Sequence, residues 1–220
     1  MYMANNVVAH ALRDVYWIVG GPCGGKTTAA QYLERKYGLR HYNADETVVG
    51  YKSIATASEQ PALCRYFPDW ETYFGQSPQE YSQWLKALNE DVVPMHILEL
   101  AVLARQGPVV FEGIFPLQLL RQIAAHRRIV ILTASDEVIA QSYFDREDKQ
   151  PMLKRIQTLP EPQAIMDRIL EMCINDTHAL KAEADRLHLR VIEHSVGRDV
   201  ATMTQAIERH FRVPQSSSTE

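Results

Sequence analysis

One segment near the N-terminus constrains the fold of this chain more than any other feature. It reads Gly-Gly-Pro-Cys-Gly-Gly-Lys-Thr over residues 20–27 and matches the phosphate-binding pattern G-x-x-x-x-G-K-S/T at every fixed position. The apolar residues 15–19 before it predict a buried strand, and the good helix formers of residues 28–37 after it predict a helix that Gly38 ends. A strand, a glycine-rich turn and a helix are the context in which this pattern binds phosphate.

Each part of this loop has an expected role in a nucleotide site. The glycines let successive backbone N–H groups curl around an anion, and the start of the helix adds partial positive charge. Lys26 would reach the β- and γ-phosphates of ATP, and the Thr27 hydroxyl would ligate Mg²⁺. The residues expected to bind the nucleotide are Gly21, Cys23, Gly24, Gly25, Lys26, Thr27, Thr28 and, near the C-terminus, Arg198. The alternative is a glycine-rich turn that a Lys-Thr pair follows by chance.

The length and charge of the chain narrow the alternatives. At 220 residues it suits one α/β domain with a helical insertion, and its net charge of −4 disfavours nucleic acid as the main partner. The N-terminus lacks the pattern of a signal peptide, and no apolar run reaches the length of a membrane span. We therefore expect no membrane association, a cytoplasmic location and a monomer or homodimer.

The cysteines support the same setting. Cys23, Cys64 and Cys173 are far apart, their total is odd and none forms a C-x-x-C pair. This pattern argues against a disulfide framework or a zinc site and favours a reducing compartment. Cys23 is interpreted as a small residue that fills space in the loop, with a thiol made reactive by Lys26 as the alternative.

Five short apolar runs alternate with helical patterns, which predicts an α/β fold with a parallel, doubly wound sheet. The runs cover residues 15–19, 39–43, 109–111, 129–132 and 189–192. Helices are predicted from Ser135 onward, from about Glu161 to Arg186 and from Asp199 onward. We expect a single domain over residues 1–213 and a polar, disordered tail over residues 214–220.

Residues 46–107, between the second and third predicted strands, are too many for an ordinary crossover and predict a helical insertion. A capping box over residues 77–80 begins a helix, which Pro94 is expected to restart or kink. The insertion is rich in aromatic residues, which form either its own small core or the wall of a second-substrate site. They include Tyr66, Phe67, Trp70, Tyr73 and Phe74. We expect the second substrate to bind here, with Lys52, Arg65 and Arg40 as candidate anion anchors.

Two acidic positions follow predicted strands. Asp45, or its neighbour Glu46, comes where the second strand ends, at the edge of the sheet where ligands bind in such folds. A carboxylate there could accept a proton from an attacking hydroxyl, although it could instead cap the next helix. Glu112 ends the third strand, where an acid commonly holds a water of the Mg²⁺ shell, so Thr27 and Glu112 are the expected metal residues.

Two later segments complete the predicted site. Residues 145–160 are charged and interrupted by proline, and we expect them to form a mobile lid, with a solvated surface loop as the alternative. A cation that closes over the γ-phosphate stabilises the charge of the transition state. Arg146 is the predicted catalytic cation, and Lys149, Lys154 and Arg155 are auxiliaries. Residues 193–199 link the fifth strand to the last helix, a natural place for a pocket that holds the nucleotide base.

The order of these parts resembles the P-loop small-molecule and nucleotide kinases, such as shikimate kinase, gluconate kinase, chloramphenicol phosphotransferase and adenylate-kinase-like enzymes. The phosphate loop is similar to theirs, and Asp45 matches an acid that in several of them contacts the acceptor hydroxyl. Residues 146–153, REDKQPML, are similar to the arginine-x-x-arginine-proline-leucine-leucine lid of shikimate kinase. Lys149 replaces the second arginine, and Gln150 intervenes before the proline.

This resemblance covers residues 14–46, 109–155 and 188–211 and does not reach the insertion. It implies a three-layer α/β/α fold of the P-loop NTPase type, with a five-stranded parallel sheet in the order 2-3-1-4-5. It also implies that the γ-phosphoryl group of ATP moves, with Mg²⁺, to a hydroxyl or phosphate of a small molecule. The identity of that acceptor is not readable from the chain.

Other nucleotide-binding classes fit less well. The chain lacks the N-K-x-D and D-x-x-G motifs of a GTPase, and it is too short for a motor ATPase. A polynucleotide kinase would need a local basic patch, for which Arg121, Arg127 and Arg128 are the candidates. The main alternative is a P-loop nucleotide-binding regulator, or an ATPase without kinase activity. Asp45, Glu112 and Arg146 argue against this alternative, because they are expected to lie where phosphoryl transfer needs them.

Overall fold

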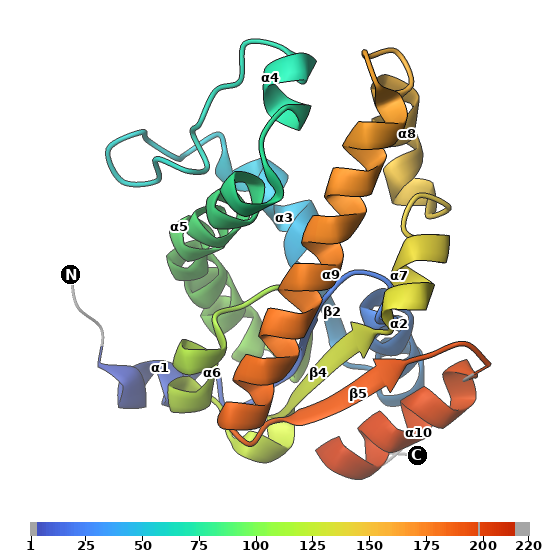
Figure 1. The fold of residues 1–220 in the computed structure, drawn as a ribbon. Helices are drawn as coiled ribbons and strands as arrows, with labels where there is room; N and C mark the ends of the chain where they lie inside the picture. Colours follow the sequence, from blue (N-terminus) through green and yellow to red (C-terminus); the bar gives the residue numbers. More distant parts are fainter. Residues whose placement is uncertain (1–3, 198, 214–220) are drawn as a thin grey trace.

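A central parallel sheet organises the chain, whose computed structural model describes residues 4–197 and 199–213. Its strand order is β2-β3-β1-β4-β5, and every pair of neighbours is parallel. The strands are β1 (Val15–Gly20), β2 (Arg40–Asn43), β3 (Val109–Gly113), β4 (Ile129–Ala134) and β5 (Arg190–His194). Figure 1 shows helices on both sides of this sheet. The predicted fold class, including the strand order 2-3-1-4-5, is confirmed.

The two faces of the sheet carry separate cores, because alternate residues of each strand point to opposite sides. On one face, β1 packs Tyr16 and Ile18 against α2 (Lys26–Tyr37) and α10 (Val200–Phe211). On the other face, Trp17 lies in a larger core with four helices. These helices are α1 (Asn5–Ala11), α5 (Pro78–Ala104), α6 (Leu117–Ile123) and α9 (Pro162–Arg186). The sequence patterns did not predict α1 and α6, each of which has only seven residues.

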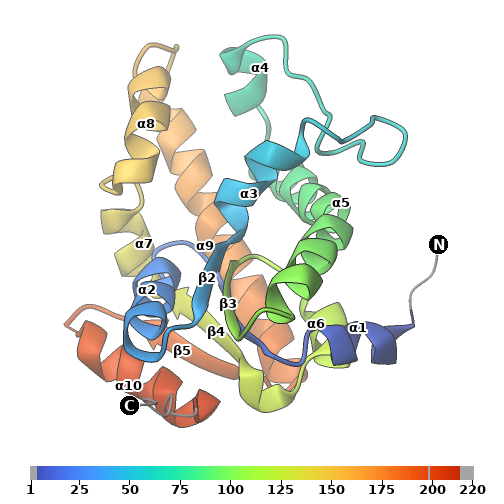
Figure 2. The same ribbon diagram turned by 180° about the vertical axis from the view of Figure 1, so that it is seen from behind.

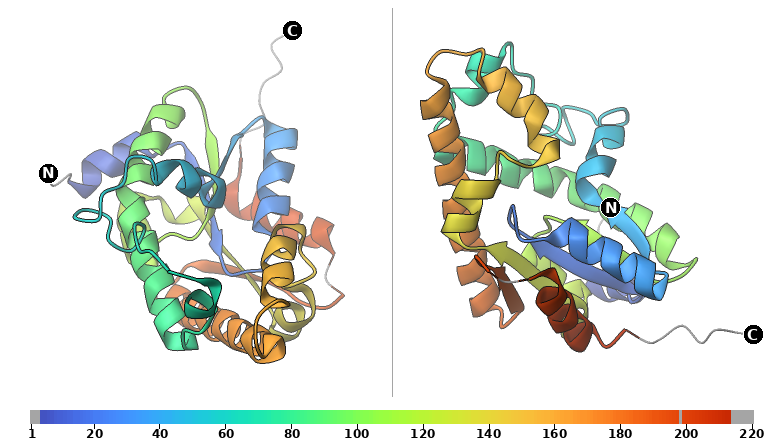
Figure 3. Two further views of the ribbon diagram at one scale, coloured as in Figure 1. Left: turned by 90° about the horizontal axis from the view of Figure 1, so that it is seen from above. Right: turned by 90° about the vertical axis from the view of Figure 1, so that its right-hand side faces the viewer.

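A group of short helices stands above the carboxyl ends of the strands (Figures 1 and 2). They are α3 (Ala44–Tyr51), α4 (Trp70–Phe74), α7 (Asp136–Ser142), the 3-10 turn η2 (Glu147–Lys149) and α8 (Gln150–Ile156). The starts of α5 and α9 rise beside them, as the side view in Figure 3 shows. A second 3-10 turn, η1 (His126–Arg128), precedes β4 at the opposite edge of the sheet.

The insertion between β2 and β3 is helical, as predicted. Both halves of the capping box form, since the Ser77 side chain accepts from the Glu80 N–H and the Glu80 side chain accepts from the Ser77 N–H. The helix α5 continues through Pro94, so the predicted restart is wrong. Pro94 and Glu90 are both exposed, and water can therefore satisfy the Glu90 carbonyl that the proline leaves without an N–H partner. Packing of Val93 and Ile97 in the sheet core holds the helix on both sides of the proline.

The aromatic residues of the insertion form mainly its own small core. Phe67 and Tyr73 both meet Trp84 edge to face, and Trp70 stacks on Phe74. Tyr66 and Trp70 remain exposed, with 81% and 48% of their surfaces accessible. The packing therefore supports the interpretation as a small core for the others, whereas Trp70 lies at its surface and Tyr66 outside it.

Candidate active site

The phosphate loop takes the path that its glycines permit. Cys23 and Gly25 have left-handed backbone conformations, with φ of 57° and 82°. A Cβ atom on Gly20 or Gly24 would lie 1.8 Å or 2.7 Å from the Leu132 carbonyl oxygen of β4. The neighbouring strand therefore excludes any side chain at these two positions. The result is a tight turn of backbone over the end of the sheet, directly before the N-terminus of α2.

Lys26 is the first residue of α2 and lies across this turn. Its Nζ donates to the Gly21 carbonyl at 2.8 Å, so the ammonium stays inside the loop. Burial lowers the pKa of Lys26, the carboxylates of Asp45 and Glu112 oppose that shift, and the Arg146 cation adds to it. These electrostatic effects mean that the three other side chains lie near the ammonium. An anion in the loop would stabilise the charged lysine that burial disfavours.

Thr27 and Glu112 meet directly, although 85 positions separate them in the chain. The Thr27 hydroxyl donates to Glu112 Oε2 at 2.9 Å, and Glu112 is only 3% exposed. His41 of β2 binds the other carboxylate oxygen, with Nε2 at 3.0 Å from Oε1. This hydrogen bond raises the pKa of His41 against the effect of partial burial. The sequence analysis missed His41, although its place two residues before the end of a strand could have suggested it.

Asp45 lies in the first turn of α3, and it is exposed. The residue that caps α3 is Asn43, whose side chain accepts from the N–H groups of Asp45 and Glu46. The alternative that Asp45 or Glu46 caps this helix is therefore wrong. Asn43 Nδ2 also donates to the Glu46 carboxylate at 3.0 Å, whereas the Asp45 carboxylate acts on Lys26. Of the two acids, Glu46 is bound to the residue that caps the helix, and Asp45 is the one whose charge influences the pKa of Lys26.

The segment predicted to be a lid (residues 145–160, called the lid segment below) is largely helical, with η2 and α8 over residues 147–156. Most of its charged side chains are exposed, as the alternative of a solvated surface segment expects. Arg146 precedes η2, and its Nε and Nη2 donate to the two carboxylate oxygens of Asp148 at 2.9 Å each. The Arg146 cation also lowers the pKa of the Cys23 thiol, so its charge acts on the phosphate loop. Of the three auxiliaries, Lys154 and Arg155 are exposed on α8, and Lys149 lies 2.9 Å from the Asp148 carboxylate.

Two contacts join the loop to more distant parts of the chain. Burial raises the pKa of the Cys23 thiol despite the opposing effect of Arg146, which fits a residue that fills space. The Cys23 carbonyl lies 3.0 Å from Nδ1 of His194 at the end of β5, a contact that the sequence analysis missed. Thr28 is exposed in the first turn of α2. The predicted base-binding residue Arg198 lies outside the described residues.

Several basic residues lie away from this edge. Arg40 begins β2 at the opposite edge of the sheet and donates to Gln106, so its prediction as a substrate anchor is wrong. Arg127 and Arg128 are also at that opposite edge, in η1, where the Arg128 guanidinium packs over the Tyr16 ring. The sequence pattern predicted correctly which edge of the sheet holds the carboxyl ends of the strands. Arg40, however, begins a short strand and therefore lies at the opposite edge from the one expected.

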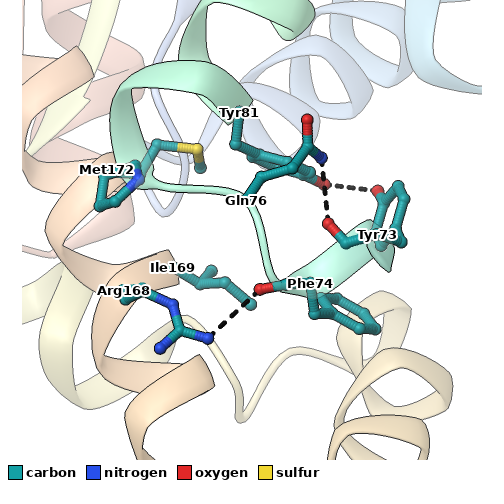
Figure 4. Close-up of a pocket in the computed structure, with 8 residues that line it drawn as sticks. Tyr73, Phe74, Gln76, Tyr81, Arg168, Ile169 and Met172 are labelled. Carbon is teal, nitrogen blue, oxygen red and sulfur yellow. Dashed lines mark hydrogen bonds between the residues drawn. The ribbon is translucent and has the colours of Figure 1, made fainter. Parts of the chain in front are cut away.

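A small cavity lies between α9 and the turn from α4 to α5 (Figure 4). Gln76 donates to the Tyr73 carbonyl on one side, and Arg168 donates to the Phe74 carbonyl on the other. The volume of about 20 Å³ holds roughly one water molecule. This cavity is therefore a packing feature of the insertion, too small for a metabolite. Among the described residues, no helix combines the length and the apolar character that a membrane span requires.

Comparisons with known proteins found similarity only among solved structures. No protein-family model matches the chain, and no curated protein matches it. Among solved structures, it is similar to a shikimate kinase from Acinetobacter baumannii, with 17% identity over 91% of this chain and 95% of that one and a TM-score of 0.46. It is also similar to a putative kinase from Chloroflexus aurantiacus, with 13% identity, 91% and 97% coverage and a TM-score of 0.43.

A third similar structure is a dephospho-CoA kinase from Campylobacter jejuni, with 14% identity over 91% of this chain and 97% of that one and a TM-score of 0.39. Identities and TM-scores this low say nothing about substrate or residue roles. The features of this chain that bear on its function are therefore its own strand order and the geometry of its phosphate loop.

Proposed function

We propose that this chain is an ATP-dependent phosphotransferase that moves the γ-phosphoryl group to a hydroxyl or phosphate of a small molecule. One observation supports the proposal: five side chains with suitable chemistry lie at the carboxyl edge of the sheet. They are Lys26, Thr27, Asp45, Glu112 and Arg146, contributed by α2, α3, β3 and the lid segment. A protein that only binds a nucleotide would not need the Asp45 carboxylate or, besides Lys26, a second cation such as Arg146.

The loop fits ATP and Mg²⁺. Backbone N–H groups of residues 23–28 and the Lys26 ammonium would hold the phosphates, as the positive φ values and the absence of side chains at Gly20 and Gly24 allow. Thr27 gives its hydroxyl hydrogen to Glu112, so the lone pairs of its oxygen remain available to a cation. Thr27 and the buried Glu112 carboxylate would therefore hold Mg²⁺, which when bound neutralises charge on the phosphates.

The remaining residues act on the acceptor and on the transferring group. Asp45 would accept the proton of an acceptor hydroxyl, since its exposed carboxylate faces the loop. Arg146 would turn from Asp148 to the transferring phosphoryl group, where its planar guanidinium stabilises the growing charge. The acceptor itself would lie between the insertion and the lid segment, which meet where Arg155 lies over the Trp70 ring at 5.4 Å.

Two measurements test this function. Calorimetry with ATP and Mg²⁺ should detect binding to the wild type and weaker binding to Lys26→Ala. A screen of nucleosides, sugars, sugar phosphates, aminoglycosides and hydroxy acids should then find a compound that increases ADP release by the wild type only. Binding of ATP with no acceptor-dependent release across the screen would favour the regulator or simple ATPase, and absence of ATP binding would overturn the nucleotide site altogether.

A further inference from the structure

The Glu112 carboxylate has a partner that the proposed transfer reaction does not require. Thr27 binds its Oε2, and His41 binds its Oε1 from the neighbouring strand β2. In the sheet, Asn43 lies opposite Glu112, so His41 reaches it diagonally from two residues earlier. The His41 side chain is only 15% exposed. Both oxygens of a buried carboxylate are thus held, one by the phosphate loop and one by a separate strand.

The length of the side chain explains why a second partner matters. A glutamate has one more rotatable bond than an aspartate, so a carboxylate held at one oxygen alone can still rotate away from the loop. Holding the second oxygen fixes the plane of the carboxylate and keeps Oε2 directed at Thr27. Partners of this kind, behind the direct ligands of a metal, orient those ligands and influence the affinity for the metal.

We infer that His41 is a positioning residue, whose Nε2–H holds Glu112 in the orientation that the Mg²⁺ side of the nucleotide site needs. This inference rests on the proposed function, because it assigns His41 to the same site. His41 touches neither nucleotide nor acceptor in this assignment, and it acts only through Glu112. The inference predicts that loss of the His41 N–H weakens the Mg²⁺-dependent part of ATP binding and leaves the metal-independent part unchanged.

The test compares ATP affinity with Mg²⁺ and with EDTA in matched variants. His41→Met keeps the approximate length of the side chain but has no N–H donor, whereas His41→Gln retains one. We expect His41→Met to lose roughly 10-fold or more of the Mg²⁺-dependent increase in ATP affinity, with the affinity in EDTA unchanged. His41→Gln should lose much less. The control is His10→Ala, which removes an exposed histidine of α1.

A double-mutant cycle sharpens the assignment. Glu112→Asp shortens the acid, so it cannot reach Thr27 and His41 together, and His41→Met should add little in that background. In the wild type, the imidazole Nε2–H signal of His41 in NMR spectra should move when Mg²⁺ is added to the ATP-bound protein. That measurement needs no variant, so it tests the positioning role of His41 even if His41→Met does not fold.

The outcomes separate the two proposals. A wild type that binds no ATP in either condition overturns the proposed function and this inference with it. A wild type with Mg²⁺-dependent ATP binding that His41→Met retains within about twofold overturns the positioning role alone. An Nε2–H signal that ignores Mg²⁺ does the same.

Discussion

The two faces of β2 hold two histidine–carboxylate clusters that differ in almost every property. His41 faces α2 and pairs with the buried Glu112, which raises the pKa of His41. Tyr42, the next residue, faces α5 and meets His96, whose burial lowers its pKa to about 4. Adjacent residues thus lead to a carboxylate-bound histidine beside the phosphate loop and to a buried, uncharged histidine on α5.

The second cluster, the Tyr42 network, consists of Tyr42, Tyr51, His96 and Glu99. Tyr42 Oη lies 2.8 Å from His96 Nδ1 and 2.7 Å from Tyr51 Oη, and Tyr51 donates to the Glu99 carboxylate at 2.6 Å. It ties the end of α3 to the middle of α5. The polar groups of the network form hydrogen bonds with one another, whereas the side chains beside the phosphate loop include groups that can bind a ligand. We therefore expect changes beside the loop to remove activity and changes in the network to remove stability.

The largest effect is expected from Lys26→Ala. Without its ammonium, acceptor-dependent turnover should fall by about 10³-fold or more, because this charge holds the β- and γ-phosphates and stabilises the transition state. The midpoint of thermal unfolding should change by no more than a few degrees. Steady-state kinetics and calorimetric melting check both parts, with the exposed Lys86→Ala as the matched control. Wild-type turnover in Lys26→Ala would remove the phosphate loop from the reaction.

Asp45→Asn should rank next. It keeps the shape of the side chain but cannot accept a proton, so turnover should fall by roughly 10²-fold or more while ATP affinity stays within a few fold. The matched control is Glu46→Gln, since that neighbouring acid is bound to Asn43. If Glu46→Gln proves to be the inactive variant, Glu46 and not Asp45 accepts the proton.

Arg146→Ala should lower turnover by about 10-fold to 10³-fold and weaken ATP binding much less, because its charge acts on the transferring group. Arg186→Ala, at the exposed end of α9, is the control. Hydrogen exchange over residues 145–160 should slow when ATP, Mg²⁺ and acceptor are all bound. Exchange that stays the same throughout would show that this segment does not close over the site.

The next prediction concerns His96, which contacts Tyr42 of β2, and the dependence of stability on pH. The pKa of His96 is about 4 in the folded chain against 6.5 for the ordinary side chain. Between these values the unfolded state binds more protons, so the stabilising contribution is complete above about pH 6.5 and is lost as the pH falls towards 4. The loss should reach roughly 2–3 kcal/mol. Urea unfolding of the wild type and of His96→Gln at several pH values in this range measures the loss. If the free energy of unfolding depends on pH equally in the two proteins, the prediction is wrong.

The smallest effect should come from Tyr42→Phe, which removes one hydroxyl from the network. We expect a loss of about 1–2 kcal/mol in the free energy of unfolding, because the neighbouring polar groups lose a buried partner. Turnover at saturating substrate should remain within a few fold. A loss of turnover as large as that of Asp45→Asn, with stability unchanged, would make the network part of the reaction and erase the contrast between the two faces.

Local patterns were enough for the parts of the site that are contiguous in the chain. The strand, turn and helix around Lys26 could be predicted because the backbone conformations of that loop depend on its own glycines. The capping box at Ser77 is equally local. The cap of α3 at Asn43 was missed for a related reason, since several neighbouring side chains could have filled that role and only the observed geometry distinguishes them.

The amino-acid sequence alone predicts the phosphate loop, the alternation typical of a parallel sheet, and the acids at the carboxyl ends of β2 and β3. How these parts come together depends on the folded structure. His41 and Glu112 are 71 positions apart, and Tyr42 and His96 are 54 positions apart, so no periodicity within one segment links them. The pairing of β2 with β3, and the packing of α5 against both, bring these side chains together. Such contacts depend on the register between strands and on burial, which belong to the assembled core and not to any one stretch of chain.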